Sequence, residues 1–74
     1  MKIFIERFKS LRKQKKLTQK QLGENINTPE RVIRGYEIGE NMPSIETFIK
    51  IADFFNVSID YLVGRTDNPK GENL

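Results

Sequence analysis

Three charged residues in the stretch TPERVIRGYE, which runs from Thr28 to Glu37, are spaced to act together on one surface. Glu30, Arg31 and Arg34 fall within little more than one helical turn. An arginine can donate two parallel hydrogen bonds to guanine O6 and N7, which adds about 1–3 kcal/mol of base discrimination. A glutamate can accept from the amino group of cytosine, or it can repel phosphates. The alternative interpretation is a solvated helix surface with no binding role.

The composition gives little support to catalysis. The 74 residues include no cysteine and no histidine, so the chain has no disulfide, no thiolate metal ligand and no serine-histidine or cysteine-histidine pair. No nucleophile with an adjacent base, no phosphate-binding loop and no metal-ligand cluster is evident in the sequence. We therefore expect no enzymatic activity, no cofactor or metal, and no small-molecule substrate.

Charge is distributed unevenly along the chain. Residues 1–20 contain eight Lys and Arg against one Glu, a net charge of +7, whereas the other residues contain five basic and nine acidic groups, a net charge of −4. This asymmetry would orient the molecule on a polyanion, although the run from Lys13 to Lys16 alone is typical of a solvated helix face. The longest apolar run is three residues, as in Ile3–Ile5, too short for a membrane span or a signal peptide. Because cysteine is absent as well, we expect a cytoplasmic protein with no membrane partner.

Capping residues and apolar spacings predict an all-α fold. No stretch alternates with the period of two that a strand requires. Thr18 and Gln21 have the spacing of a capping box. Asn27 suits a left-handed turn, after which Thr28 is expected to cap the next helix with Pro29 in its first position. Helices are expected at about residues 3–16, 18–26, 29–38, 45–55 and 59–63.

These helices are expected to form one compact domain over residues 1–65. Apolar residues recur along them at spacings of three and four, which identifies the buried face of each helix. The expected core residues are Phe4, Phe8 and Leu11 of the first helix, Leu22 and Ile26 of the second, Ile45, Phe48, Ile49, Ala52 and Phe55 of the fourth, and Ile59 and Leu62 of the fifth. Residues 66–74 have almost no apolar content and are expected to be a flexible tail.

The third expected helix has two different faces. Its inward set is Val32, Ile33 and Tyr36, and its outward set is Arg31, Arg34 and Ile38, flanked by Glu30 and Gly35. Only residues 27 and 28 join it to the helix before it, which is typical of a helix-turn-helix, in which the second helix of the motif enters the major groove. Gly23 fits this motif because a helix that crosses close by leaves little room for a side chain.

A succession of motifs follows the order of a known family. The motifs are LRKQKKLTQKQLGENI, the turn NT, the YE-x-G pattern of Tyr36, Glu37 and Gly39, the MPS before the fourth helix, and IKIADFFNVSIDYLVGRTD. They fall in register without an insertion and cover about four fifths of the chain. The span from Phe8 to Thr66 thus resembles the lambdoid phage repressor and Cro family, also called the XRE family. The resemblance implies a five-helix DNA-binding domain that usually binds a palindromic operator as a dimer.

The resemblance and the helical wheel together suggest roles for individual positions. The expected base contacts are Glu30, Arg31, Arg34 and, through its backbone, Gly35. The expected phosphate contacts are Thr18, Gln19, Lys20, Thr28 and Asn41. Arg12 and Glu37 match a family ion pair between the first and third helices, and are assigned to structure. The expected dimer contacts are Phe54, Val57, Ile59, Tyr61 and Val63.

Four departures from the family pattern weaken the expected DNA contact. Pro29 stands at a position often filled by a polar capping residue, and Gly35 lacks the polar side chain that commonly faces DNA. Ile38 stands where an asparagine often contacts phosphate, and Glu40 with Asn41 replaces a basic loop. We therefore expect modest affinity and a modest dependence of binding on salt.

Two functions are consistent with the sequence. The first is a small Cro-like transcriptional repressor that binds double-stranded DNA as a homodimer. The second is a protein-binding module, such as an antirepressor or antitoxin, that keeps the fold. This module would dock a protein partner on the outward surface that bears Glu30, Gly35, Ile38 and Glu40.

Overall fold

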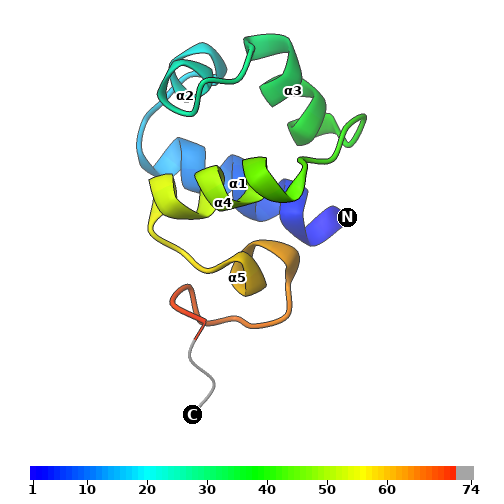
Figure 1. Cartoon of the computed structure of the whole chain (residues 1–74), viewed down its shortest axis with the longest axis vertical. Helices are drawn as coiled ribbons and strands as arrows, with labels where there is room; N and C mark the ends of the chain where they lie inside the picture. The colour runs from blue at the N-terminus through cyan, green and yellow to red at the C-terminus, as the bar shows by residue number, and fades with distance from the viewer. Residues whose placement is uncertain (72–74) are drawn as a thin grey trace.

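The computed structural model describes residues 1–71, which form five helices and no strand. The helices are α1 (Lys2–Gln14), α2 (Gln19–Asn25), α3 (Glu30–Ile38), α4 (Ile45–Phe55) and α5 (Ile59–Val63). The expected all-α fold is confirmed, and the bounds differ from expectation by at most two residues, in α1 to α3. Figure 1 shows α2 and α3 at one end of the molecule and α5 at the other. No helix within residues 1–71 is long and apolar enough to cross a membrane.

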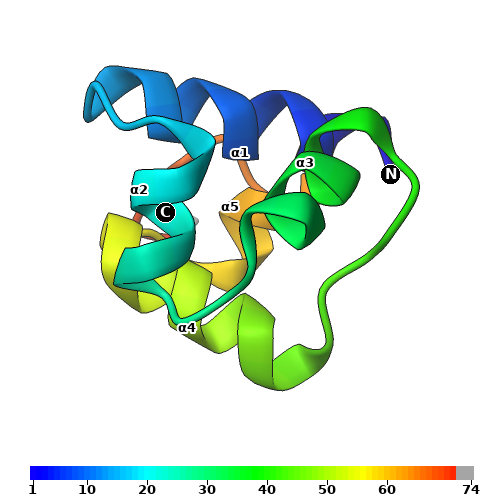
Figure 2. The same cartoon turned by 90° about the horizontal axis from the view of Figure 1, so that it is seen from above.

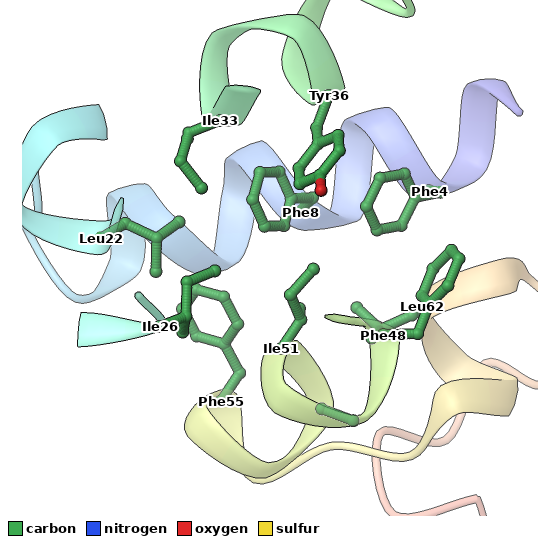
Figure 3. Close-up of a cluster of buried hydrophobic side chains, with 11 residues drawn as sticks. Phe4, Phe8, Leu22, Ile26, Ile33, Tyr36, Phe48, Ile51, Phe55 and Leu62 are labelled. Atoms are coloured by element: carbon green, nitrogen blue, oxygen red, sulfur yellow. The ribbon is translucent and has the colours of Figure 1, made fainter. Parts of the chain in front are cut away.

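The core lies between α1 and α4, which run on opposite sides of the molecule when it is seen from above (Figure 2). Phe4 and Phe8 of α1 stack with their ring centroids 5.3 Å apart. Phe48 of α4 meets Phe4 edge to face at 5.0 Å, and Tyr36 of α3 meets Phe8 edge to face at 5.9 Å. Figure 3 shows side chains from all five helices converging on this cluster. The buried apolar residues are Phe4, Phe8, Leu22, Ile26, Ile33, Tyr36, Phe48, Ile51, Ala52, Phe55 and Leu62.

The buried face of α4 differs from the expected one. Ile45 and Ile49 were expected in the core, but their exposed fractions are 66% and 47%. Ile51, which was not expected there, is fully buried. The buried stripe consists of Phe48, Ile51, Ala52 and Phe55. The prediction was wrong because spacings of three and four describe two overlapping stripes on α4, and the neighbouring helices cover only one of them.

The expected cap of α2 is present, whereas the expected cap of α3 is not. Thr18 and Gln21 form the predicted capping box, with Gln21 N donating to Thr18 Oγ1 at 3.0 Å. Asn27 is left-handed, with φ of 54°. Thr28 does not cap α3: the N-cap is Pro29, and the Thr28 hydroxyl donates to the carbonyl of Ile26 at 3.2 Å. The hydroxyl therefore helps to close the turn, and it accepts no hydrogen bond from a backbone N–H of α3.

The segment after α5 makes hydrogen bonds with the helical domain, and the structure describes it as far as residue 71. Thr66 is buried, and its carbonyl accepts a hydrogen bond from Arg7 Nη1 at 2.8 Å. Arg7 also pairs with Asp67 at 2.9 Å, and Ser58 N donates to Pro69 O at 2.7 Å. Hydrogen bonds thus reach from the helical domain to this segment, although residues 67–70 are exposed, and the expected boundary at residue 65 stays a prediction. The rest of the expected tail, residues 72–74, lies outside the described residues.

Candidate nucleic-acid interface

The turn between α2 and α3 packs directly on Gly23. Thr28 N donates to Gly23 O at 2.8 Å, so the chain folds back over the glycine. A Cβ atom at Gly23 would lie 2.3 Å from the carbonyl oxygen of Thr28. No side chain can stand there unless the backbone of the turn moves. The glycine therefore fixes the angle at which α3 leaves α2.

A buried ion pair holds α3 against α1. Arg12 Nε lies 2.6 Å from Glu37 Oε2, and Arg12 Nη2 lies 3.0 Å from Glu37 Oε1. The side chains of Arg12 and Glu37 are 13% and 3% exposed. Arg12 also donates to the carbonyl of Leu17, and Gln19 Nε2 donates to Glu37 Oε1 at 3.2 Å. The pair that the family resemblance implied is present, and it joins three helices.

The surroundings of Glu37 keep it ionised. Burial opposes the charged form, but hydrogen bonds from Arg12 and Gln19 and the positive charges of Arg12 and Lys9 outweigh burial and lower the pKa of Glu37. The hydrogen bond with Glu37 raises the pKa of Arg12. Both groups are charged at neutral pH, so together they add no net charge to the surface of α3.

The outer side of α3 is free and charged. Glu30, Arg31 and Arg34 are exposed, and none of them forms an ion pair within residues 1–71. Ile38, one turn beyond Arg34, is 58% exposed. Lys20 lines a shallow hollow between α2 and the start of α3 together with Thr28 and Glu30. The structure thus brings expected base contacts and expected phosphate contacts onto one surface.

Gly35 is an exception among the expected base contacts. It is buried, and a Cβ atom built on it would lie 2.2 Å from Asn41 Nδ2 and 3.2 Å from Asn41 Cγ. The side chain of Asn41 therefore covers Gly35, and a base cannot approach the glycine backbone directly. This contact was not predicted from the sequence, although a glycine on the outward face of a helix was a signal that another side chain fills the space.

The side chains of the other expected phosphate contacts differ in whether their hydrogen-bonding groups are already used within the chain. Gln19 is half-buried, and one of its N–H groups is used by Glu37. The Thr18 hydroxyl is exposed but accepts the helix-capping hydrogen bond. The side chains of Lys20 and Asn41 are exposed and make no hydrogen bond within residues 1–71. Lys20 and Asn41 are thus the two with all their donors available.

The expected dimer surface surrounds α5 and the end of α4. Phe54, Val57, Ile59 and Val63 are half-buried and pack against the core of this chain. The guanidinium of Arg7 lies over the ring of Tyr61, with Arg7 Cζ 4.1 Å from the ring centroid. Arg7 was not identified from the sequence, because its hydrogen-bonding partners include the backbone carbonyls of residues 61 and 66, which leave no signal in residue type.

The fold and this surface define a helix-turn-helix domain. Residues 8–62 match the helix-turn-helix family model. The chain therefore belongs to the XRE-type helix-turn-helix family, which consists of DNA-binding regulators and not of enzymes.

The chain is similar to proteins that are named transcriptional regulators or repressors. It is 36% identical over 67 residues to the uncharacterized HTH-type transcriptional regulator YobD of Bacillus subtilis, a match that covers 90% of this chain and 60% of YobD. It is 36% identical over 69 residues to the cryptic phage CTXphi transcriptional repressor RstR of Vibrio cholerae, covering 93% of this chain and 62% of RstR. A crystal structure of a transcriptional regulator from Listeria innocua superposes with a TM-score of 0.79 at 35% identity, over 93% of this chain and 64% of that one. The chain thus spans about three fifths of the length of the curated relatives it matches.

Proposed function

We propose that this chain is a sequence-specific transcriptional regulator that binds double-stranded DNA with the outer side of α3 in the major groove. The observation that carries the proposal is the exposure of Arg31 and Arg34, without ion-pair partners in residues 1–71. The opposite side of the same helix is held by Ile33 and by the buried carboxylate of Glu37. A helix of this kind fits the major groove of B-DNA, which is about 12 Å wide.

In this proposal each exposed group has a distinct partner. Arg31 donates two hydrogen bonds to a guanine, and Arg34 contacts a neighbouring base. Glu30 accepts from a cytosine amino group. Lys20 and Thr28 approach phosphates along the hollow beside α2, and Thr18 approaches a phosphate at the start of α2. DNA binding would place the protein in the cytoplasm, with the nucleic acid that it regulates.

The proposed mode of action is repression by a homodimer on a palindromic operator. RstR, which is similar over most of this chain, is named a transcriptional repressor. The half-buried apolar residues around α5, Phe54, Val57, Ile59, Tyr61 and Val63, are the proposed contact with the second copy. A twofold dimer would place two copies of α3 in successive major grooves about 34 Å apart.

Selection of binding sites from randomised duplex DNA tests the proposal. We expect the chain to enrich an inverted repeat with half-sites about 10 base pairs apart. Arg31→Ala and Arg34→Ala should each relax the preference at one base pair of the half-site. Arg65→Ala removes an arginine that is 79% exposed near the end of α5, and should leave the selected sequence unchanged. If neither Arg31→Ala nor Arg34→Ala alters the selected sequence, α3 does not read bases.

A second candidate function is a protein-binding module. The observation in its favour is exposed apolar surface at Ile38 on α3 and at Met42 in the loop that follows. Titration of random duplex with salt separates the two functions, because phosphate contacts release counterions. Negligible DNA affinity even at low salt would favour the protein-binding function, whereas measurable affinity that falls with salt would favour DNA binding.

A further inference from the structure

The loop after α3 places one polar side chain on the outer surface of that helix. This loop joins α3 to α4 and is the green segment beyond α3 in Figure 1. Gly39 is left-handed, with φ of 81°, a conformation that glycine adopts at little cost. Glu40 N and Asn41 N then both lie within hydrogen-bonding distance of Gly35 O, at 2.9 and 3.3 Å. The chain thus turns back at the end of α3, and the backbone of Asn41 is held there by the Gly35 carbonyl of the last helical turn.

The carboxamide of Asn41 fills the space of an absent side chain. A Cβ atom at Gly35 would lie 2.2 Å from Asn41 Nδ2, far inside van der Waals contact. Residue 35 lies four positions after Arg31, so the two share one face of α3 and are about 6 Å apart along the helix axis. A polar amide therefore stands on the same face of α3 as Arg31, about one turn along, where the helix itself offers only a glycine.

The amide of Asn41 has no evident structural task. The side chain is exposed and makes no hydrogen bond within residues 1–71. The end of α3 is already closed by the backbone N–H groups of Gly39, Glu40 and Asn41, all three of which donate to Gly35 O. The amide keeps both its donor and its acceptor for a ligand. The backbone N–H of Asn41 is held by Gly35 O, so binding has to order only the side chain of this residue and not the loop backbone beneath it.

We propose that Asn41 reads an adenine in the major groove and so replaces the recognition side chain that Gly35 lacks. An asparagine carboxamide can accept from adenine N6 and donate to adenine N7 at the same time, a pairing that phosphate does not offer. Base pairs repeat about every 3.4 Å, so this adenine lies within about two base pairs of the guanine that Arg31 contacts. The inference rests on the proposed function, and it changes the role of Asn41 from the expected phosphate contact to a base contact.

Two substitutions remove the amide from this place by different routes. Asn41→Ala deletes it. Gly35→Ala displaces the amide, because the atom that would clash is the end of a flexible side chain. This substitution should not lower the Tm, because alanine favours a helix more than glycine does. Both variants should lose preference for the same adenine by about fivefold or more in binding-site selection. Glu40→Ala, the matched control in the same loop, should keep that preference.

A modified base gives a second readout. Replacing the selected adenine by 7-deazaadenine removes only the N7 acceptor. The unsubstituted protein should then bind several-fold more weakly, whereas Asn41→Ala and Gly35→Ala should bind both duplexes equally.

The inference can fail while the proposed function stands. If Arg31→Ala changes the selected sequence but Asn41→Ala and Gly35→Ala do not, Asn41 does not read a base. A uniform loss of affinity on all sequences in Asn41→Ala, with equal binding of the 7-deazaadenine duplex by the unsubstituted protein, would likewise assign Asn41 to phosphate. If the unsubstituted protein selects no sequence at all, the proposed function fails together with the inference.

Discussion

The inner and outer sides of α3 differ in what holds their charged groups. On the inner side, Glu37 is buried and receives hydrogen bonds from Arg12 and Gln19. On the outer side, Arg31 and Arg34 are exposed and unpaired within residues 1–71. Removing one partner of a paired and desolvated ion pair costs much folding stability. Free charged groups, by contrast, are available to a ligand. The comparison predicts that inner substitutions unfold the protein and outer ones change only what it binds.

The largest effect is expected from breaking the buried pair. Glu37→Ala leaves the partly buried guanidinium of Arg12 without its carboxylate, and loss of one partner of a buried pair costs about 3–5 kcal/mol. The free energy of unfolding in urea measures this loss. Glu24→Ala, at an exposed position on α2, is the control and should stay within about 0.5 kcal/mol of the unsubstituted protein. A loss below 1 kcal/mol for Glu37→Ala, by the same order-of-magnitude scale, would contradict the structural role of the pair.

The next largest loss of stability is expected at only one of two glycines that both lack room for a Cβ atom. At Gly23 the obstacle is the backbone carbonyl of Thr28, so Gly23→Ala must distort the turn and should cost about 1–3 kcal/mol or more. At Gly35 the obstacle is the movable end of Asn41, so Gly35→Ala should retain full stability. Thermal unfolding of both variants tests the difference, and equal losses of Tm would refute it.

Acid should weaken the inner side selectively. The pKa of Glu37 is lower in the folded chain than in the unfolded one. Its stabilisation is therefore complete above the unfolded value, about 4.3, and is lost as the pH falls through the folded value. Unfolding free energies between pH 7 and the acid limit should fall more steeply for the unsubstituted protein than for Glu37→Gln, which cannot titrate. Parallel curves for the two would show that Glu37 does not contribute to acid sensitivity.

The smallest effect is expected on the outer side, from Lys20. If Lys20 contacts one phosphate, Lys20→Ala should reduce the slope of log affinity against log salt by about 0.9 on any duplex, with no change in Tm. Lys50→Ala, which removes an exposed lysine from α4, is the control and should leave the slope unchanged. A normal slope in Lys20→Ala would remove Lys20 from the interface.

Local chemistry made much of the fold predictable. Ser44 and Ser58 each accept a hydrogen bond from the backbone N–H three residues later, at 3.2 and 2.9 Å, and α4 and α5 begin at the expected residues. Caps act over one helical turn, so the sequence alone contains both partners. The two faces of α3 were predictable for the same reason, because periodicity is a property of one helix.

Contacts that depend on tertiary geometry were not predictable in this way. The exposure of Ile45 and Ile49 depends on which side of α4 the other helices cover. The position of Asn41 over Gly35 depends on the path of a loop, and the packing of residues 66–71 depends on Arg7, about sixty residues away in the sequence. These contacts join partners whose residue types alone do not identify each other.

Protection of guanine N7 from methylation by dimethyl sulfate tests the central claim most directly, because N7 faces the major groove. On a selected operator, the unsubstituted protein should protect a guanine in each half-site. Arg31→Ala, with unchanged Tm, should leave that guanine reactive while the flanking contacts persist. Full protection of the same guanine by Arg31→Ala, or reactivity throughout the site with the unsubstituted protein bound, would contradict the placement of the outer side of α3 in the groove.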